Sequence, residues 1–264
     1  MTDSFFDRRV SEYMTCDVET ADVEDPVEAL AQTMHGRGIS GLPVLQGGKL
    51  VGVVTRTDLI QLGVMQTGRR WTSPAMPLPH RRAGDVMTRE PRVIAPGAPL
   101  RDAARIMSDH GLHRVFVVDG ARLAGVISTL DLAAAVRDAR IEAPLSSVMT
   151  SLILSVDVRA PLGTAIELLA RVTVSGLIVT EDGLPVGMFT QLDALASRDL
   201  PRGTPIEATY DAAVICLPAE TKLHRAAAHA AQLDVRRVVV CRAREAVGVV
   251  SGLDFARVAS GQRS

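Results

Sequence analysis

The chain has 264 residues, 47% hydrophobic and 22% charged, so it can bury a globular core and does not have the composition of a disordered protein. Its 29 basic and 30 acidic residues leave a formal charge of −1, which removes any general electrostatic case for binding nucleic acid or an anionic membrane. No stretch approaches the ~20 apolar residues of a membrane span, the residues after Met1 do not resemble a signal peptide, and three cysteines cannot build a disulfide framework. We therefore expect a cytoplasmic protein with reduced thiols.

The pattern Gly-x-x-Thr/Ser-x-x-Asp occurs four times, at residues 52–58, 125–131, 187–193 and 248–254. At the same distance before each copy stands Met-Thr, or Tyr-Asp in the fourth copy, and no gap is needed inside any repeat. A repeat of this kind has to be recognised first, because it decides the fold. The copies predict repeats at 8–65, 83–140, 143–200 and 204–262, with a linker at 66–82.

Each repeat is predicted to open with a short extended segment followed by an amphipathic helix. In the first repeat Val27, Leu30, Ala31 and Met34 fall at i, i+3, i+4 and i+7, and the other repeats carry apolar residues or alanine at the same offsets. Short β-rich runs follow, each with turn residues and a second strand that leads into the Gly-x-x-Thr/Ser-x-x-Asp pattern; the runs are 42–45, 115–118, 177–179 and 238–240.

The resulting order, β-α-β-β-α, predicts an α/β (α+β) fold made of four repeats. About 55 residues of this kind cannot bury both faces of their sheet alone. We therefore expect the repeats to pair through their sheets, the first with the second and the third with the fourth, as two pseudo-twofold modules.

The Met-Thr opening, the helix, the hairpin and the closing pattern resemble cystathionine-β-synthase (CBS) motifs, and four copies resemble two tandem-pair (Bateman) modules. The resemblance covers nearly the whole chain except the first dozen residues and the linker. It implies a regulatory module without an attached catalytic domain. The implied ligands are adenosine-containing molecules, such as AMP, ADP, ATP or S-adenosylmethionine, bound in clefts between paired motifs.

The closing pattern carries chemistry of its own in every repeat. A Thr or Ser with Asp three residues later outlines a helix capping box, although such boxes favour Glu or Gln at the second position. A carboxylate can also accept from both hydroxyls of a ribose, and a helix N-terminus offers amides to a phosphate. Both interpretations stay open for the same residues, which are Thr55, Asp58, Ser128, Asp131, Thr190, Asp193, Ser251 and Asp254.

The extended opening segments match the family's hydrophobic-x-Thr/Ser element, which the resemblance implies flanks the purine. On the residues alone, ordinary core packing is the stronger interpretation. The matching residues are Val18, Thr20, Pro91, Val93, Ile153, Ser155, Val214 and Cys216.

A clearer difference between repeats lies where the first helix meets its strand. The second repeat has His113-Arg114 and the fourth has Arg236-Arg237, while the first and third have Ser-Gly at the same positions. The His-Arg pair resembles the phosphate-binding element in the γ subunit of AMP-activated protein kinase. A guanidinium suits phosphate because it presents forked donors and stays charged. The alternative is an arginine near a helix C-terminus that is stabilised by the helix dipole.

Other patterns do not support an enzyme or a metal site. The string Gly36-x-Gly38-x-x-Gly41 follows a helix and precedes a strand, which reverses the context of a dinucleotide fingerprint. The pairs His110 with His113 and His224 with His229 lack a third ligand at metal spacing, and no nucleophile motif is present.

We therefore predict a non-catalytic sensor that binds an adenine nucleotide, uses no cofactor or metal, and signals to an unidentified regulated protein. The alternatives are an enzyme acting on nucleotides and a nucleic-acid binder that uses arginine patches; neither a membrane nor a nucleic acid is an expected partner. A monomeric disk and a homodimer are both compatible with four repeats, and the unequal linkers favour the homodimer.

Overall fold

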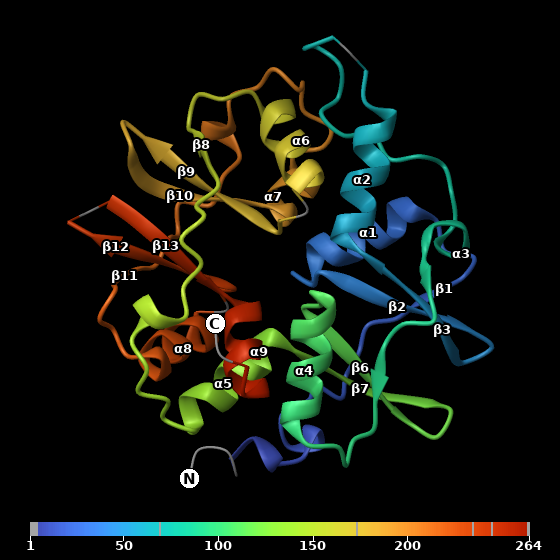
Figure 1. Ribbon diagram of the computed structural model, residues 1–264. Helices are drawn as coiled ribbons and strands as arrows, with labels where there is room; N and C mark the ends of the chain where they lie inside the picture. Colours follow the sequence, from blue (N-terminus) through green and yellow to red (C-terminus); the bar gives the residue numbers. More distant parts are fainter. Residues whose placement is uncertain (1–4, 69, 173, 234, 244, 263–264) are drawn as a thin grey trace. The chain divides into compact units, whose positions relative to one another are not determined.

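The computed structural model describes residues 5–68, 70–172, 174–233, 235–243 and 245–262 (Figure 1). The chain forms two compact units. Unit 1 consists of residues 1–18, 91–153 and 215–264, and unit 2 of residues 19–90 and 154–214. The second and fourth repeats therefore build unit 1, and the first and third repeats build unit 2.

Unit 2 contains a four-stranded sheet of order β1-β2-β3-β4 and a three-stranded sheet of order β10-β9-β8. In each sheet the first strand of the repeat runs parallel to the hairpin strand beside it, and the hairpin itself is antiparallel. The elements are β1 (Ala21–Asp22), α1 (Val27–Gly36), β2 (Gly41–Gln46), β3 (Lys49–Thr55), α2 (Arg56–Gln66), α3 (Ala83–Val86), β4 (Thr88–Arg89), β8 (Ser155–Asp157), α6 (Leu162–Val172), β9 (Gly176–Glu181), β10 (Leu184–Thr190), α7 (Gln191–Ala196) and η4 (Ile206–Ala208).

Unit 1 contains two three-stranded sheets of orders β5-β6-β7 and β11-β12-β13. Helices α4 and α5 pack against α8 and α9, as Figure 1 shows in green and red. The elements are η1 (Phe5–Asp7), η2 (Val10–Glu12), β5 (Val93–Ile94), α4 (Leu100–His110), β6 (Arg114–Asp119), β7 (Arg122–Ser128), α5 (Thr129–Asp138), η3 (Leu145–Ser147), β11 (Cys216–Pro218), α8 (Leu223–Gln232), β12 (Arg237–Arg242), β13 (Glu245–Ser251) and α9 (Gly252–Ser260).

The predicted order β-α-β-β-α is confirmed in all four repeats. Every position predicted for the apolar stripe of the first helix is buried; in α1 these are Val27, Leu30, Ala31 and Met34. Each unit has its own hydrophobic core, formed by these stripes, the inner faces of the hairpins and the second helices. Burial of the stripes is therefore what holds each pair of repeats together.

The hairpin turns follow from their glycines. Gly47 and Gly48 between β2 and β3 have φ angles of 55° and 77°, and Gly120 and Gly183 take the same left-handed region in two other hairpins. Glycine reaches this region without the steric cost that a Cβ would add. The two-residue turn fixes the register of each hairpin, which decides what lies opposite the capping residue at the end of the second strand.

The opening segment of each repeat lies on the neighbouring repeat along the chain. Thr15 of the first repeat bridges Val126 of the second, and Thr88 of the second pairs with Val53 of the first. The third and fourth repeats make the same exchange through Thr150 with Val249 and Met188 with Asp211. Each of these bridges lies within one unit, where helices join the second repeat to the fourth and the first to the third. The predicted pairing of the first repeat with the second and of the third with the fourth through their sheets stays a prediction.

The first strands begin later than the sequence indicates. Val18 and Thr20 precede β1, and Pro91, Ile153 and Val214 lie before β5, β8 and β11. These strands have two or three residues each, because only a short stretch hydrogen-bonds to the hairpin before the chain turns into the helix.

The predicted linker packs on unit 2 through main-chain bonds. The Ala75 amide donates to Leu200 O, and the Gly203 amide donates to Trp71 O, at 2.8 and 2.9 Å. The Arg202 guanidinium lies 5.2 Å from the centre of the Trp71 ring. The insertion therefore braces the joint that follows the third repeat rather than hanging free.

Candidate functional site

The Thr/Ser-x-x-Asp segments form complete capping boxes at the start of α2, α5, α7 and α9. In each box the Asp Oδ2 accepts from the backbone amide and from the hydroxyl of the Thr or Ser, both at 2.7 Å. Burial is the main cause that raises the pKa of Asp131 and of Asp193, although the box hydrogen bonds act in the opposite direction. The capping interpretation is therefore confirmed for all four repeats, and it uses the same oxygen each time.

The fourth repeat differs from the others at this carboxylate. Asp254 is 2% exposed, and its second oxygen, Oδ1, pairs with the Arg257 guanidinium one helical turn along α9. Asp58, Asp131 and Asp193 are half-buried. The residue three positions after each of them is Gln61, Ala134 or Ala196, so Arg257 has no counterpart in the other repeats.

Strand register places the residues before the hairpin beside the capping residue. Arg114 is the Cα partner of Ser128, and Arg237 is the partner of Ser251. In unit 2 the same register positions hold Gly41 opposite Thr55 and Gly176 opposite Thr190. A guanidinium and a capping carboxylate therefore share one sheet edge in the second and fourth repeats only.

Four basic residues where the second and fourth repeats of unit 1 meet are called the basic cluster: His113, Arg114, Arg236 and Arg237. Burial is the main cause that lowers the pKa of His113 to about 4, and the charges of Arg237, Arg236 and Arg114 contribute to this shift, in that order. Burial and the charge of Arg236 also lower the pKa of Arg237 to about 10. The second and fourth repeats thus contribute to a single positive region, in which each cation raises the cost of charging the next.

The first residue of the second helix lies next to the residue before the hairpin. The amides of Thr129 and Gly252 donate to His113 O and Arg236 O at 3.0 and 3.2 Å. A Cβ at Gly252 would lie 2.2 Å from Thr129 Oγ1, so these helix starts touch where the two repeats meet. Because Thr129 and Gly252 are small, the space where the two repeats of unit 1 meet is available to the side chains of the basic cluster.

Unit 2 fills the corresponding positions in the opposite way. Arg56 and Gln191, the first residues of α2 and α7, are each 6% exposed, and their amides donate to Ser40 O and Ser175 O. Arg56 Nε donates to Ile39 O at 2.9 Å. The Gln191 side-chain amide donates to Thr57 Oγ1 at 3.0 Å and to Val174 O at 3.3 Å. The sequence analysis missed both residues, although comparing the residue after each capping Thr or Ser would have found them.

A third residue that the sequence analysis missed is Asp211, which replaces the threonine of the Met-Thr opening. Its backbone pairs with Met188 of the third repeat, and its charge contributes to the raised pKa of Asp193. One carboxylate of the third repeat, that of Asp193, and one from the opening of the fourth repeat, that of Asp211, therefore lie near one end of β10. The sequence signal was the departure of Tyr210-Asp211 from Met-Thr.

The residues expected to flank a purine share one trend in exposure. The last residue of each element, Thr20, Val93, Ser155 or Cys216, is exposed, and the first residue, Val18, Pro91, Ile153 or Val214, is half-buried. In the first, third and fourth repeats the element lies where the chain passes from one unit to the other. Their proximity to a ligand therefore stays a prediction.

The element of the fourth repeat also contains a thiol pair. The Cys216 and Cys241 side chains hydrogen-bond to each other across β11 and β12, and both cysteines are free thiols. Burial, followed by the contact with Cys216, raises the pKa of Cys241 to about 12. Cys241 is therefore protonated and a poor nucleophile near neutral pH.

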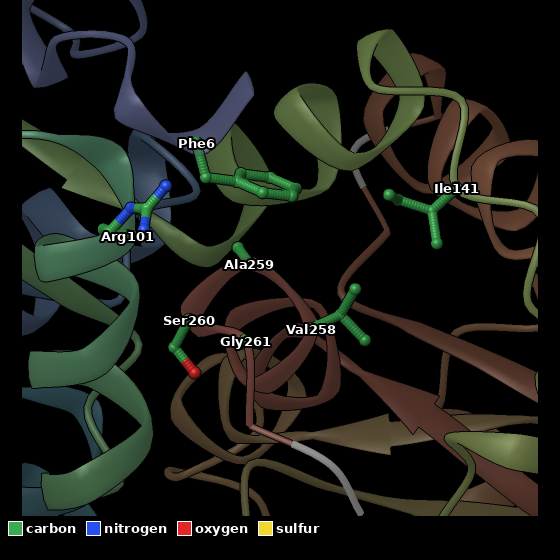
Figure 2. Close-up of a pocket in the computed structure, with 7 residues that line it drawn as sticks. All are labelled: Phe6, Arg101, Ile141, Val258, Ala259, Ser260 and Gly261. Atoms are coloured by element: carbon green, nitrogen blue, oxygen red, sulfur yellow. The ribbon is translucent and has the colours of Figure 1, made fainter. Parts of the chain in front are cut away.

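A cavity of about 220 Å³ opens in unit 1 at the end of α9. Figure 2 shows Phe6 and Arg101 on one side of it and Ile141 on the other, with α9 residues 258–261 between them. Arg101 forms an ion pair with Asp7 at 2.7 Å. No residue proposed from the sequence lines this cavity, so it is separate from the capping-box edges.

Across the described ranges, no group of three or more His, Cys, Asp or Glu side chains is arranged to hold a metal ion. The same part of the chain contains no helix that is long and apolar enough to cross a membrane.

The family described as CBS domain matches residues 10–64, 83–138 and 145–198. A 33.4 kDa protein from the ribosomal RNA operon of Thermofilum pendens is 26% identical over 73% of this chain and 63% of its own length. The inosine-5'-monophosphate dehydrogenase of Korarchaeum cryptofilum is 31% identical over 47% of this chain and 24% of its own length. The matches therefore span less than two thirds of these curated relatives.

Two solved structures share the fold over 95% of this chain and 99% of their own. The crystal structure of protein MJ1225 from Methanocaldococcus jannaschii has a TM-score of 0.81 at 16% identity. A conserved protein from Pyrococcus horikoshii has a TM-score of 0.66 at 20% identity. At these identities the likeness shows the fold alone and carries no ligand with it.

Proposed function

Because the chain belongs to the family of CBS-domain proteins, we propose that it is a non-catalytic sensor that binds adenosine-containing nucleotides at its capping-box edges. The binding changes its conformation, and the change is passed to a regulated protein. One observation carries the proposal: the register that sets Arg114 opposite Ser128 and beside Asp131. That edge combines a donor for phosphate with an acceptor for ribose.

The capping box and ribose binding are compatible at one carboxylate. A carboxylate has two oxygens and about four acceptor positions, and the box uses Oδ2. The box also holds the side chain in one orientation before a ligand arrives, which reduces the entropy lost on binding. The same aspartate can therefore cap the helix and accept from the 2′- and 3′-hydroxyls.

The phosphate side is provided by the basic cluster. Arg114 and Arg237 stand beside the N-termini of α5 and α9, and amides at a helix N-terminus add to the attraction for an anion. Three arginines in one partly desolvated region favour a ligand with negative charge, since an anion removes repulsion among these cations, and the neutral His113 beside them can only hydrogen-bond to it. The exposed residues Thr20, Val93, Ser155 and Cys216 are proposed to flank the purine.

The repeat boundaries 8–65, 83–140, 143–200 and 204–262 are proposed as the four motifs, with the linker at 66–82. Sensing a nucleotide involves no chemical reaction, and the residues proposed for binding act through hydrogen bonds and charge alone. The ligand classes are AMP, ADP, ATP and S-adenosylmethionine.

Thermal unfolding in the presence of each nucleotide tests this function. A ligand that binds only the folded state adds RT ln(1 + [L]/Kd), about 2.7 kcal/mol at a hundredfold excess over Kd. We expect at least one adenine nucleotide at millimolar concentration to raise the melting temperature, and native mass spectrometry to report its mass and stoichiometry. An unchanged melting curve with AMP, ADP, ATP, adenosine and S-adenosylmethionine would overturn the proposal. Turnover of ATP would instead favour the alternative of a nucleotide-acting enzyme.

A further inference from the structure

We propose that the two units select adenosine compounds by charge, a division that rests on the proposed function. Unit 1 takes ligands that carry phosphate on the basic cluster. The third repeat, in unit 2, takes ligands whose 5′ substituent is neutral or positively charged, such as a nucleoside, a thioether or a sulfonium. The proposal rests on two features of the molecule: the basic cluster in unit 1, and the carboxylates of Asp193 and Asp211 in unit 2.

Unit 1 concentrates positive charge at the position where a 5′ substituent would lie. Arg114 and Arg237 are opposite the capping serines, and His113 and Arg236 precede them in the chain. The arginines of both repeats act on His113, so the charges from the two repeats add rather than serve separate sites. A phosphate bound there is attracted by guanidinium groups from both repeats.

The third repeat has negative rather than positive charge near its capping box. Gly176 stands opposite Thr190, so the position held by Arg114 and Arg237 in unit 1 carries no side chain. Asp211 replaces the threonine found at this point of the other three openings, and its backbone pairs with Met188 of β10, two residues before the capping Thr190. From there its charge acts on Asp193. A phosphate would meet two carboxylates there, whereas a sulfonium would be attracted by both.

Unit 2 does contain one buried guanidinium near its helix starts, that of Arg56 in the first repeat. Its Nε donates to Ile39 O, so this side chain is held on the main chain of its own repeat. Beside it, Gln191 of the third repeat is held by Thr57 and Val174 O. These bonds brace the helix starts, and the amide of Gln191 brings no charge to the third repeat.

Calorimetric titrations with AMP, adenosine and S-adenosylmethionine test the division on the full chain. The double variant Arg114→Gln with Arg237→Gln should lose AMP affinity by ten- to a hundredfold, as expected when hydrogen bonds to a charged group are removed, and keep S-adenosylmethionine affinity. Asp211→Thr restores the residue of the other repeats. It should weaken S-adenosylmethionine by roughly tenfold, leave adenosine nearly unchanged and leave AMP binding in unit 1 intact.

Two further variants assign the sites. Asp193→Asn, which keeps an acceptor for the capping box, should weaken S-adenosylmethionine and spare AMP, and Asp131→Asn should do the reverse. Circular dichroism and melting curves confirm that each variant is folded. If AMP affinity falls with Asp193→Asn and not with Asp131→Asn, or if the double arginine variant loses both ligands equally, the division by charge is wrong while nucleotide sensing stands. If Arg56→Gln removes AMP binding, Arg56 is a phosphate ligand and the division is also wrong. If the wild type binds none of the three ligands, the division by charge is wrong, and if it binds neither ADP nor ATP either, the proposed function itself fails.

Discussion

The two units are built from the same repeat, with the same capping boxes and the same hairpin register. They differ in which positions of the repeat carry the long side chains that lie where two repeats meet. Unit 1 places long basic side chains before the hairpin and small residues, Thr129 and Gly252, at the helix starts. Unit 2 has Ser-Gly before the hairpin and long side chains, Arg56 and Gln191, at the helix starts. The fold therefore limits the side-chain volume that fits where two repeats meet. The side chains that fill this space can come from the residues before the hairpin or from the helix starts.

The different placement of the long side chains in the two units has an electrostatic consequence. Side chains at the helix starts of unit 2 turn to main-chain carbonyls of the residues near the hairpin, Ile39 O and Val174 O. Basic side chains before the hairpin of unit 1 lie beside the capping residues, and burial, followed by the charges of the neighbouring arginines, lowers the pKa of His113 and of Arg237. In unit 2 the long side chains are therefore held by main-chain hydrogen bonds, whereas in unit 1 the same part of the fold is suited to binding an anion.

Replacing a buried phenylalanine in either unit should have the largest effect on stability. Phe255 is 1% exposed in the core of unit 1, and Phe189 is fully buried in unit 2. Phe→Ala in a core costs about 3–5 kcal/mol. Trp71, the single tryptophan, belongs to unit 2, so Phe189→Ala should move its fluorescence transition in denaturant more than Phe255→Ala does. Equal shifts of the Trp71 transition in both variants would show that the two cores unfold as one.

The stability of unit 1 should fall as the pH is lowered from about 6.5 to about 4. The unfolded chain protonates His113 near its ordinary pKa of about 6.5, whereas the folded chain does not until about 4, so the unfolded state binds the proton first. The loss integrates to about 3 kcal/mol. His113→Gln should flatten this part of the stability curve, measured by urea unfolding at each pH. An equal slope in wild type and His113→Gln would contradict the burial of a neutral His113.

Burial raises the pKa of Asp131 and of Asp193, which gives the opposite sign at lower pH. These carboxyls take up protons in the folded state first, so they favour the folded state as the pH falls toward their ordinary range. The comparison of wild type with His113→Gln removes their contribution, since it is the same in both proteins.

Removing one guanidinium from the basic cluster should separate phosphate binding from ribose binding. Arg114→Ala should weaken AMP by about 1.5–3 kcal/mol, roughly ten- to a hundredfold, and leave adenosine nearly unchanged. Asp131→Ala should weaken both, because both ligands carry the ribose. Calorimetric titration of the two ligands into each variant provides the measurement. Equal AMP affinity in wild type and Arg114→Ala would return Arg114 to the role of a cation near a helix terminus.

The periodicity of the sequence was sufficient for the repeat, its element order and its buried stripe, because these depend on residues close together in the chain. The capping boxes could also be predicted, since Ser128 and Asp131 are three residues apart. What periodicity cannot show is which repeat an opening segment contacts, as for Thr15 on Val126, because main-chain pairing between distant segments leaves no side-chain pattern. Periodicity also cannot show that the helices of the second repeat pack on those of the fourth, because an apolar stripe does not specify which other stripe covers it.

The candidate site was predictable where all repeats agree, and less so where one repeat departs from the rest. Arg114 and Arg237 were visible because Ser-Gly stands at the same positions elsewhere. Asp211, Gln191 and Arg257 are single departures, and their meaning depends on contacts that only the folded chain supplies. Comparison among the four repeats is therefore the way to find such residues, and the structure is needed to judge them.

Arg257→Ala should have the smallest effect and should change the fourth repeat alone. The Arg257 guanidinium pairs with Oδ1 of Asp254, the oxygen that the capping box does not use, and there it competes with ribose hydroxyls. The Arg257 side chain is 40% exposed but that of Asp254 is only 1% exposed, so losing the pair leaves a buried carboxylate with the capping box alone and should cost at least about 1 kcal/mol of stability. Freeing the oxygen should strengthen adenosine binding at this repeat by about 1 kcal/mol, roughly fivefold.

Calorimetric titration of adenosine into Arg257→Ala measures this gain, and Gln61→Ala is the matched control. Gln61 holds the same position relative to Asp58 as Arg257 holds relative to Asp254. It carries no charge, so its removal should leave adenosine affinity unchanged. If Arg257→Ala binds adenosine no more tightly than the wild type does, Asp254 serves only as the cap of α9, and ribose binding is confined to the carboxylates of the other three repeats.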